Sequence, residues 1–388
     1  MLITRKIEPE LKSIAKVYPV ITITGPRQSG KTTLVKKIFG EKKYVSIEDP
    51  DNRELAKSDP VGFLNRFPDG AIFDEIQRVP DILSYIQGIV DKKKKKNMYV
   101  LTGSNQFQLL DGINQSLAGR TALLKLLPFD ISETLNFHKN FSVEDYIYSG
   151  FYPAVHSEKI EPVKAYRNYY ETYIERDVRQ LINIKDLMLF RKFIRLCAGR
   201  TGQIFNASQL ATETGTSVNT IKSWISILEA SYVIYLLPPW FDNISKRLIK
   251  SPKLYFIDVG LASYLLGIEN KQHIINHPLR GNLFENLVLM ELVKQRLNDG
   301  FEPNFYFFRD KHGNEVDIIF GNAKDLIAIE IKSSETYHSS FLKGIKYFEK
   351  YYKKNMKNGF VIYSGKNEQS IENINLVNFL KTQSVLEK

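Results

Sequence analysis

The sequence has very little cysteine, and its apolar segments are short. Cys197 is the single cysteine among 388 residues, so neither a disulfide nor a cysteine-rich zinc site can form within one chain. The longest apolar segments, such as SYVIYLLPPW at 231–240, are about ten residues and too short to span a bilayer. Residues 1–20 lack the apolar core of a signal peptide. We therefore expect a cytoplasmic protein, in a reducing environment, with no membrane partner.

Acidic residues are fewer than basic ones: 43 Asp and Glu against 54 Lys and Arg give a formal net charge of +11. This excess suits an acidic partner such as nucleic acid, although a lysine-rich solvated surface gives the same value. Hydrophobic residues make up 43% of the chain and charged residues 25%, as in folded proteins. A length of 388 residues exceeds one ordinary core and predicts two or three domains.

The order of apolar runs predicts an α/β fold. Between residues 20 and 128 the runs VITITG, KYVSIE, GAIFDEI, MYVLTG and ALLKLLPF alternate with helical patterns, which predicts a parallel sheet covered on both faces. From about residue 142 the pattern is helical, and residues 163–184 predict one long helix. From residue 281 a helix precedes three strands, a further helix and the strand GFVIYS.

The strongest motif is ITITGPRQSGKTTL at residues 21–34, which fits G-x-x-x-x-G-K-[ST] between an apolar strand and a helix. Its glycines let backbone N–H groups face the phosphates of ATP, beside the positive end of the helix dipole. Lys31 is expected to neutralise phosphate oxygens, and Thr32 to hold Mg²⁺. The predicted nucleotide-binding residues are Gly25, Pro26, Arg27, Gln28, Ser29, Gly30, Lys31, Thr32 and Thr33.

Further polar residues are expected where neighbouring strands end. In GAIFDEIQRVP, Asp74 is predicted to bind the Mg²⁺ shell and Glu75 to activate the attacking water. The strand in YVLTGSNQF should lie between the first strand and the Asp-Glu strand, and there Asn105, or else Ser104, is expected to polarise that water.

Hydrolysis also needs positive charge at the transferred phosphoryl group. Arg120 in SLAGRT is one candidate, and Arg176 and Arg179 in YIERDVRQ are others. For each of them, a structural or interdomain salt bridge is the favoured alternative. The sequence does not choose among them, or between action within one chain and action across a subunit boundary.

Residues 206–237 have helix-turn-helix spacing, with Gly215 at the turn and Ser217 placed to cap the second helix. Apolar side chains share one face of that helix, whereas Asn219, Lys222 and Ser226 lie outward, as in a recognition helix. The strand that follows suggests a winged version. The lysines and arginines expected to contact DNA phosphates lie further along the chain: Lys246, Arg247, Lys250 and Lys253. The alternative is that the whole unit is a purely structural or interdomain module.

Charged residues interrupt the apolar strands in NEVDIIFGNAKDLIAIEIKSS at 314–334. Glu330 and Lys332 are two residues apart and share a strand face, with Asp317 opposite them and Glu285 on the preceding helix. Carboxylates with a lysine are what metal-assisted phosphodiester hydrolysis needs, so Glu285, Asp317 and Glu330 are predicted metal ligands. The pattern matches the Asp…Glu-x-Lys signature of the restriction-endonuclease-like fold. A salt bridge of Lys332 with both acids is the alternative.

Taken over nearly its whole length, the chain resembles a widespread group of prokaryotic AAA-type ATPases with a C-terminal nuclease-like domain of unknown function. The motifs that carry the resemblance are TGPRQSGKTTL, FDEIQRVPDILSYIQ, LTGSNQFQLL, SLAGRTALLKLLPFDISE, YIERDVRQL and FFRDKHGNEVDIIF with IAIEIKSS. The resemblance implies ATP binding, hydrolysis with Mg²⁺ at Asp74 and Glu75, and a DNA-related or toxin–antitoxin-like role. The expected domains are a P-loop ATPase core (1–140), a helical and winged helix-turn-helix domain (141–265) and a restriction-endonuclease-like domain (266–388).

Two hypotheses of different class follow. The first is an ATP-driven enzyme that remodels or cuts DNA. The second is a nucleotide-dependent switch or assembly protein whose nuclease-like domain is an inactive scaffold. DNA-stimulated ATP turnover would discriminate between them. A third option is an ATPase that remodels a partner polypeptide. The sequence leaves open whether the protein forms a homo-oligomer.

Overall fold

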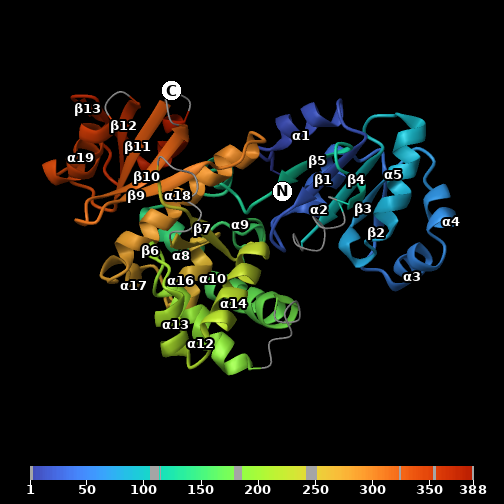
Figure 1. Ribbon diagram of the computed structural model, residues 1–388, viewed down its shortest axis with the longest axis horizontal. Helices are drawn as coiled ribbons and strands as arrows, with labels where there is room; N and C mark the ends of the chain where they lie inside the picture. The colour runs from blue at the N-terminus through green and yellow to red at the C-terminus, as the bar shows by residue number, and fades with distance from the viewer. Residues whose placement is uncertain are drawn as a thin grey trace. The chain divides into compact units, whose positions relative to one another are not determined.

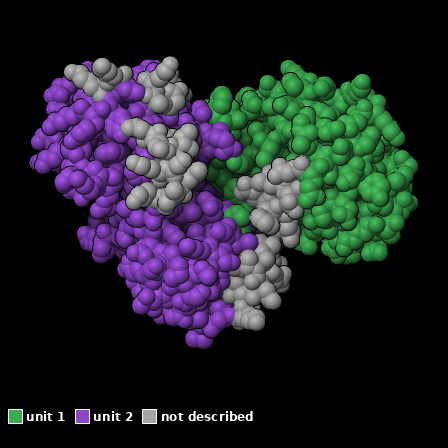
Figure 2. Space-filling model, in the orientation of Figure 1, with its two compact units in different colours: residues 1–129, 230–232, 297–301 green, residues 130–229, 233–296, 302–388 purple. Residues whose placement is uncertain are grey.

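The computed structural model describes residues 3–104, 113, 115–178, 186–241, 251–322, 325–352 and 355–386. The chain forms two compact units (Figure 2). The first contains residues 1–129 together with 230–232 and 297–301, and the second contains the remainder. Within the described residues, no helix is both long and apolar enough to cross a membrane.

The first unit is built on a five-stranded sheet of order β2-β3-β4-β1-β5, in which every neighbouring pair is parallel. The strands are β1 (Val20–Thr24), β2 (Lys43–Ser46), β3 (Ala71–Asp74), β4 (Tyr99–Gly103) and β5 (Thr121–Lys125). Four of them lie inside predicted apolar runs and β5 begins one residue before the fifth run, so the predicted parallel sheet is confirmed. Since β4 lies between β1 and β3, the polar residues after these three strands meet at one edge.

Helices cover both faces of this sheet (Figure 1). One apolar cluster joins α1 and α2 to one face, and another joins α4 and α5 to the other. The helices are α1 (Glu8–Ala15), α2 (Lys31–Ile38), α3 (Pro50–Ser58), α4 (Pro60–Asn65), the short η1 (Ile76–Arg78) and α5 (Ile82–Lys93). Asp49 begins α3 by accepting hydrogen bonds from the N–H groups of Asp51 and Asn52.

The second unit begins with helices. They are α7 (Ile131–Thr134), α8 (Val143–Ser149), α9 (Pro153–Ser157), α10 (Pro162–Tyr169), η2 (Tyr170–Val178), α12 (Leu187–Ala198), α13 (Ala207–Thr214), α14 (Val218–Ala230), α16 (Val259–Leu265) and α17 (Gln272–Ile275). The long helix predicted over 163–184 is only partly correct. It starts as α10 and continues as the π-helix η2, and residues 179–185 lie outside the described part of the chain.

The predicted helix, turn, helix and strand pattern corresponds to α13, a turn at Gly215, α14 and β7 (Ile234–Leu237). Gly215 has φ +85°, a conformation that favours glycine. Ser217 caps α14, because its hydroxyl accepts a hydrogen bond from the N–H of Thr220 at 3.1 Å. Strands β6 (Gln203–Ile204), β8 (Lys253–Phe256) and β7 form an antiparallel sheet in that order.

A six-stranded sheet of order β13-β14-β12-β11-β10-β9 follows α18 (Arg280–Asn298). Strands β9, β10 and β11 are antiparallel neighbours, whereas β11, β12 and β14 run parallel. The strands are β9 (Phe305–Arg309), β10 (Glu315–Asn322), β11 (Asp325–Lys332), β12 (Met356–Tyr363), β13 (Gln369–Ile371) and β14 (Ile374–Asn378); the helices are η3 (Ser339–Leu342), α19 (Lys343–Tyr352) and η4 (Phe379–Val385). Helix α19 packs on one face through Ile345 and Phe348. The predicted α/β fold class, with a helical middle and a C-terminal sheet, is confirmed.

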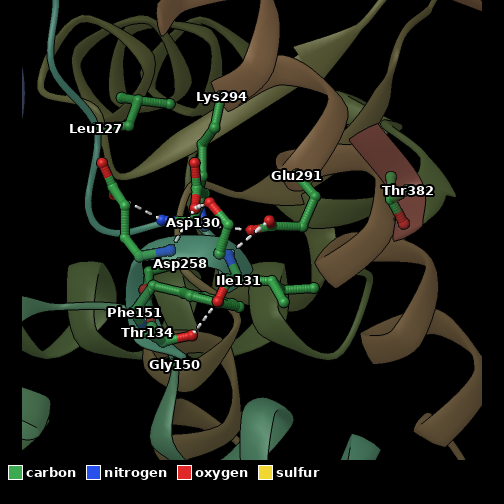
Figure 3. A network of polar contacts seen from close by, with 12 residues as sticks. Leu127, Asp130, Ile131, Thr134, Gly150, Phe151, Asp258, Glu291, Lys294 and Thr382 are labelled. Atoms are coloured by element: carbon green, nitrogen blue, oxygen red, sulfur yellow. Dashed lines mark hydrogen bonds and ion pairs between the residues drawn. The ribbon is translucent and has the colours of Figure 1, made fainter. Parts of the chain in front are cut away.

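A buried polar network ties α7 to α18 inside the second unit (Figure 3). Asp130 caps α7, and Glu291 of α18 accepts the N–H of Ile131 at 2.8 Å. The ammonium of Lys294 lies 2.8 Å from Glu291 and 3.6 Å from the ring centroid of Phe151. Burial raises the pKa of Glu291 to about 7, although the charge of Lys294 opposes the shift.

Candidate functional site

The loop between β1 and α2 adopts backbone conformations that only certain residues tolerate. Gly25 has φ +145°, and a Cβ there would lie 2.1 Å from the carbonyl oxygen of Leu126. Gly30 has φ +92° and precedes the first residue of α2. The N–H groups at the start of α2 have no partner within the helix, so this end attracts an anion.

Lys31, the first residue of α2, directly follows this loop and is almost fully buried. Its ammonium donates hydrogen bonds to the carbonyl oxygens of Gly25 (3.0 Å) and Pro26 (2.8 Å). Burial lowers the pKa of Lys31 to about 8, and the nearby charges of Glu75 and Asp74 partly offset this effect. A phosphate at the loop would favour the charged ammonium, so nucleotide binding and protonation of Lys31 reinforce each other.

The carboxylate of Asp74, the last residue of β3, accepts hydrogen bonds from three hydroxyl groups. Thr32 donates to one of its carboxylate oxygens at 2.8 Å and Tyr44 to the same oxygen at 2.7 Å. Thr102 of β4 donates to the other oxygen. We did not predict Tyr44 and Thr102 as site residues, because their contact with Asp74 depends on the register between neighbouring strands.

Glu75 follows β3 in the left-handed conformation, with φ +57°. For a residue other than glycine this conformation is uncommon and is frequent at functional sites. The hydroxyl of Ser104 donates to the Glu75 carboxylate at 3.0 Å, and the side-chain amide of Gln77 also donates to it. Asn105, the residue favoured from the sequence to polarise the attacking water, lies outside the described residues.

The chemistry of this site fits ATP with Mg²⁺. Within the described residues, the buried hydroxyl of Ser29 makes no hydrogen bond, so the loop keeps an unused polar group for a ligand. Thr32 and Asp74 bring a hydroxyl and a carboxylate oxygen to within 2.8 Å of each other, and oxygen ligands of this kind suit Mg²⁺.

Of the three candidate arginines, only Arg120 has a described side chain, and it does not join this site within one chain. Arg120 precedes β5, at the sheet edge where the strands begin, and forms an ion pair with Asp91 at 2.6 Å. The phosphate loop follows the other end of β1, so Arg120 stays a prediction only for action across a subunit boundary. The side chains of Arg176 and Arg179 lie outside what the structure describes.

Two residues distant in the sequence support the loop and were also missed. Arg5 is buried and donates to the carbonyl oxygens of Ser29 and Leu127, each at 2.8 Å. The hydroxyl of Tyr232 lies 2.7 Å from that of Thr24, the residue before Gly25. Nothing in the motif itself signals these contacts, because they depend on long-range packing.

In the second unit, the structure brings Asp317, Glu330 and Lys332 together. The ammonium of Lys332 lies 2.5 Å from Glu330 and 3.4 Å from Asp317, and Asp317 also accepts the N–H of Ile331 at 2.7 Å. Burial and the charge of Asp317 raise the pKa of Glu330 well above its usual range. Although burial opposes it, the ammonium groups of Lys332 and Lys253 lower the pKa of Asp317.

Glu285 joins the same cluster from α18, together with Lys253, which the sequence predicts to contact DNA phosphates. The ammonium of Lys253 lies 3.1 Å from Glu285 and 2.5 Å from Glu315. Tyr255 also donates to Glu285. The expectation that Lys253 contacts DNA phosphates is therefore wrong, because its side chain is buried and paired with carboxylates. Lys246, Arg247 and Lys250 lie outside the described residues.

The predicted divalent-ion site at Glu285, Asp317 and Glu330 does not fit this arrangement. In the part of the chain that the structure describes, no group of three or more His, Cys, Asp or Glu side chains is arranged to hold a metal ion. The physical reason is that each carboxylate is already paired with an ammonium group: Lys253 pairs with Glu285 and Glu315, and Lys332 pairs with Asp317 and Glu330. The alternative of a salt bridge from Lys332 to both acids agrees with the geometry.

The outward face of α14 is polar. Asn219, Lys222, Ser223 and Ser226 are exposed and Thr220 is half-buried, whereas Ile221, Ile225 and Leu228 are buried in the core. This division follows the helical period and matches the predicted faces.

Family comparisons divide the chain into three matched segments. Residues 17–135 match the model described as "AAA domain". Residues 140–272 match "Domain of unknown function (DUF8612)", and residues 280–382 match "Domain of unknown function (DUF4143)". Together with the loop geometry, the first match makes the N-terminal region a nucleotide-binding P-loop ATPase domain. The descriptions of the other two matched models name no activity.

Relatives and solved structures are similar over much of the chain. "Uncharacterized protein Rv2008c" of Mycobacterium tuberculosis is 29% identical over 343 residues, covering 87% of this chain and 75% of that protein. A Walker-type ATPase of Pyrococcus abyssi is 14% identical, with a TM-score of 0.44 over 67% of this chain and 94% of that one. A structure titled as a DNA replication initiation factor is 18% identical, with a TM-score of 0.26 over 57% of this chain and 85% of that one.

Proposed function

We propose that the ATPase domain hydrolyses ATP with Glu75 as the general base and with Thr32 and Asp74 as the Mg²⁺-binding residues. The observation that carries the proposal is the position of Glu75. It follows β3 in a strained conformation and is held by Ser104 at the end of the adjacent strand β4. A base fixed at this edge lies beside the loop that binds the phosphates.

Each side chain then has a distinct task. Lys31 exchanges its two carbonyl partners for phosphate oxygens and neutralises their charge. Tyr44 and Thr102 fix the orientation of the Asp74 carboxylate. Glu75 takes a proton from the attacking water. Bound Mg²⁺ would supply charge neutralisation at the phosphate oxygens.

The test compares Glu75→Gln with the parent in steady-state ATP turnover and in nucleotide binding by calorimetry. Glutamine keeps the hydrogen-bonding shape but cannot accept a proton, so we expect unchanged binding and a loss of at least about 100-fold in turnover. Glu48→Gln is a matched control, because Glu48 is an exposed carboxylate that pairs with Arg27 and Arg78. Turnover of Glu75→Gln within about threefold of the parent, under ~1 kcal/mol, would contradict the assignment.

We further propose that the protein works with DNA through α14. The order α12, β6, α13, α14, β7, β8, with β8 between β6 and β7, supports a winged helix-turn-helix arrangement. The exposed polar face of α14 has the residue types that contact bases and phosphates. The order of elements in the C-terminal sheet likewise supports a nuclease-like fold. Helix α18 is followed by β9, β10, β11, α19 and β12, and β12 is parallel to β11.

The test of the DNA role measures duplex binding and DNA-stimulated ATP turnover in the parent and in Lys222→Met. Lys57→Met on α3 is the matched control, because Lys57 is also an exposed helical lysine. We expect weaker DNA binding only in Lys222→Met. An ATPase that is indifferent to DNA, with no duplex binding at about 50 mM salt, would favour the switch hypothesis or a protein partner.

A further inference from the structure

Lys253, at the start of β8, extends its ammonium into the carboxylate cluster of the C-terminal sheet. Only 3% of its side chain is exposed. Its nitrogen lies 3.1 Å from Glu285, 2.5 Å from Glu315 and 5.5 Å from the ring centroid of Phe307. A buried ammonium with two carboxylates and an aromatic face around it is a built arrangement, because an unpaired buried charge is very costly.

The backbone that carries Lys253 is fixed against α18. The amide of Asn286 accepts the N–H of Phe256 at 2.7 Å and donates to the carbonyl oxygen of the same residue at 2.8 Å. Gly202, with φ +75°, donates its N–H to Leu254 at 2.7 Å, and a Cβ there would lie 3.0 Å from Asn282. These backbone hydrogen bonds fix the main chain on either side of Lys253, and this restricts where its ammonium group can lie.

Each of the four carboxylates in the cluster has a cationic partner without a metal ion, and Arg309 lies 3.5 Å from Glu315 as a third cation. Lys332 pairs with Asp317 and Glu330, and Lys253 pairs with Glu285 and Glu315. Carboxylate oxygens are the ligands that Mg²⁺ and Mn²⁺ require. An ion and the ammonium groups would compete for the same oxygens, and the ammonium groups are covalently tethered.

We propose that Lys253 acts as a built-in counter-ion that excludes divalent cations from this carboxylate cluster. The cluster then serves as a metal-free joint between the β6-β8-β7 sheet and the six-stranded sheet. All of its residues belong to the second unit, whereas the ATP site belongs to the first, so its properties can be measured without nucleotide.

The experiment titrates the full-length, nucleotide-free protein with Mn²⁺ and follows free Mn²⁺ by electron paramagnetic resonance. We expect that no Mn²⁺ site in the parent depends on Asp317, so Asp317→Asn alone should leave Mn²⁺ binding unchanged. Lys253→Met, which keeps the side-chain length but not the charge, should gain a site at least about tenfold tighter than any in the parent. Asp317→Asn in the Lys253→Met background should abolish it.

Two controls separate the tethered ammonium from general effects. Lys253→Arg keeps the positive charge and should gain no site. Lys222→Met removes an exposed lysine from the same unit and should also gain none. Tryptophan fluorescence of each variant, compared with the parent, reports whether the unit is folded.

Two results would overturn the proposal: an Asp317-dependent Mn²⁺ site in the parent, or a folded Lys253→Met variant that binds no additional Mn²⁺. If Lys253→Met does not fold, the thermal midpoint of the parent decides. It should be the same in Mn²⁺ and in EDTA. Stabilisation by Mn²⁺ that Asp317→Asn removes would refute the exclusion of the ion.

Discussion

Replacing Lys294 by methionine should destabilise the second unit strongly. The lysine is buried, and its ammonium lies 2.8 Å from Glu291 and 3.6 Å from the ring centroid of Phe151 (Figure 3). Its charge also acts on Asp258, where it opposes the rise in pKa that burial causes. Methionine fills the same space but leaves both carboxyl groups without this partner. Removing one member of a buried ion pair typically costs about 3–5 kcal/mol in unfolding free energy.

The cost should depend on pH, because Glu291 can take up a proton. Its pKa is raised to about 7 in the folded protein, from 4.5 when unperturbed. The folded state therefore binds the proton more readily than the unfolded state, and this contribution is lost as pH rises through 7. Without Lys294 the folded pKa of Glu291 rises further. The loss of unfolding free energy in Lys294→Met should thus be larger at pH 8 than at pH 6. At pH 6 the side chain of Glu291 is mostly protonated and neutral, so it needs no positive partner.

The assay is urea unfolding followed by tryptophan fluorescence at both pH values. The chain has two tryptophans, Trp224 and Trp240, and both belong to the second unit, so the ATPase domain does not contribute to the signal. Lys222→Met, an exposed change in the same unit, should stay within about 0.5 kcal/mol of the parent. A loss below about 1 kcal/mol in Lys294→Met at pH 8, or a larger loss at pH 6, would refute the reasoning.

Three further predictions concern the ATP site and the α14 face. Lys31→Ala should abolish detectable ATP binding in calorimetry, whereas Lys57→Ala should not, since Lys57 is exposed on α3. Tyr44→Phe removes one hydrogen bond to Asp74 and should raise the Mg²⁺ concentration for half-maximal turnover about two- to tenfold, with ATP affinity in EDTA unchanged; equal Mg²⁺ dependence would contradict it. If Lys222 contacts a phosphate, Lys222→Met should reduce the slope of log K against log salt by about 0.9, and an unchanged slope would exclude the contact.

The sequence predicts best those features that depend on neighbouring residues. Gly25 and Gly30 follow from a motif whose spacing encodes the loop, and the structure gives both a positive φ. Asp74 and Glu75 follow from their place at the end of an apolar strand. By contrast, Tyr44 and Thr102 reach Asp74 from β2 and β4, the strands that flank β3. The sequence predicts the place of β4, but its periodicity does not specify the register that brings these two side chains to Asp74.

Helical regions show the same limit in another form. Residues 163–178 have a pattern without glycine or proline, which predicts a continuous α-helix, yet the backbone changes to π-helix at Tyr170. Tyr166 and Tyr169 are buried, and Tyr166 bonds to Asp258, which lies 92 positions away. Tertiary contacts of this kind override a local preference for regular α-helix.

The C-terminal cluster shows why a motif of carboxylates does not by itself determine their chemistry. Strand parity correctly places Glu330 and Lys332 beside each other, and hairpin pairing adds Asp317. What decides between an ion site and a salt-bridged joint is the positive charge that the remainder of the fold supplies. That charge comes from Lys253, which lies 32 positions before Glu285 and belongs to another sheet. A divalent ion and a buried ammonium group bind the same carboxylate oxygens, so long-range packing decides which of the two cations the cluster holds. A single substitution at Lys253 is enough to test whether the cluster binds a divalent ion once this ammonium group is removed.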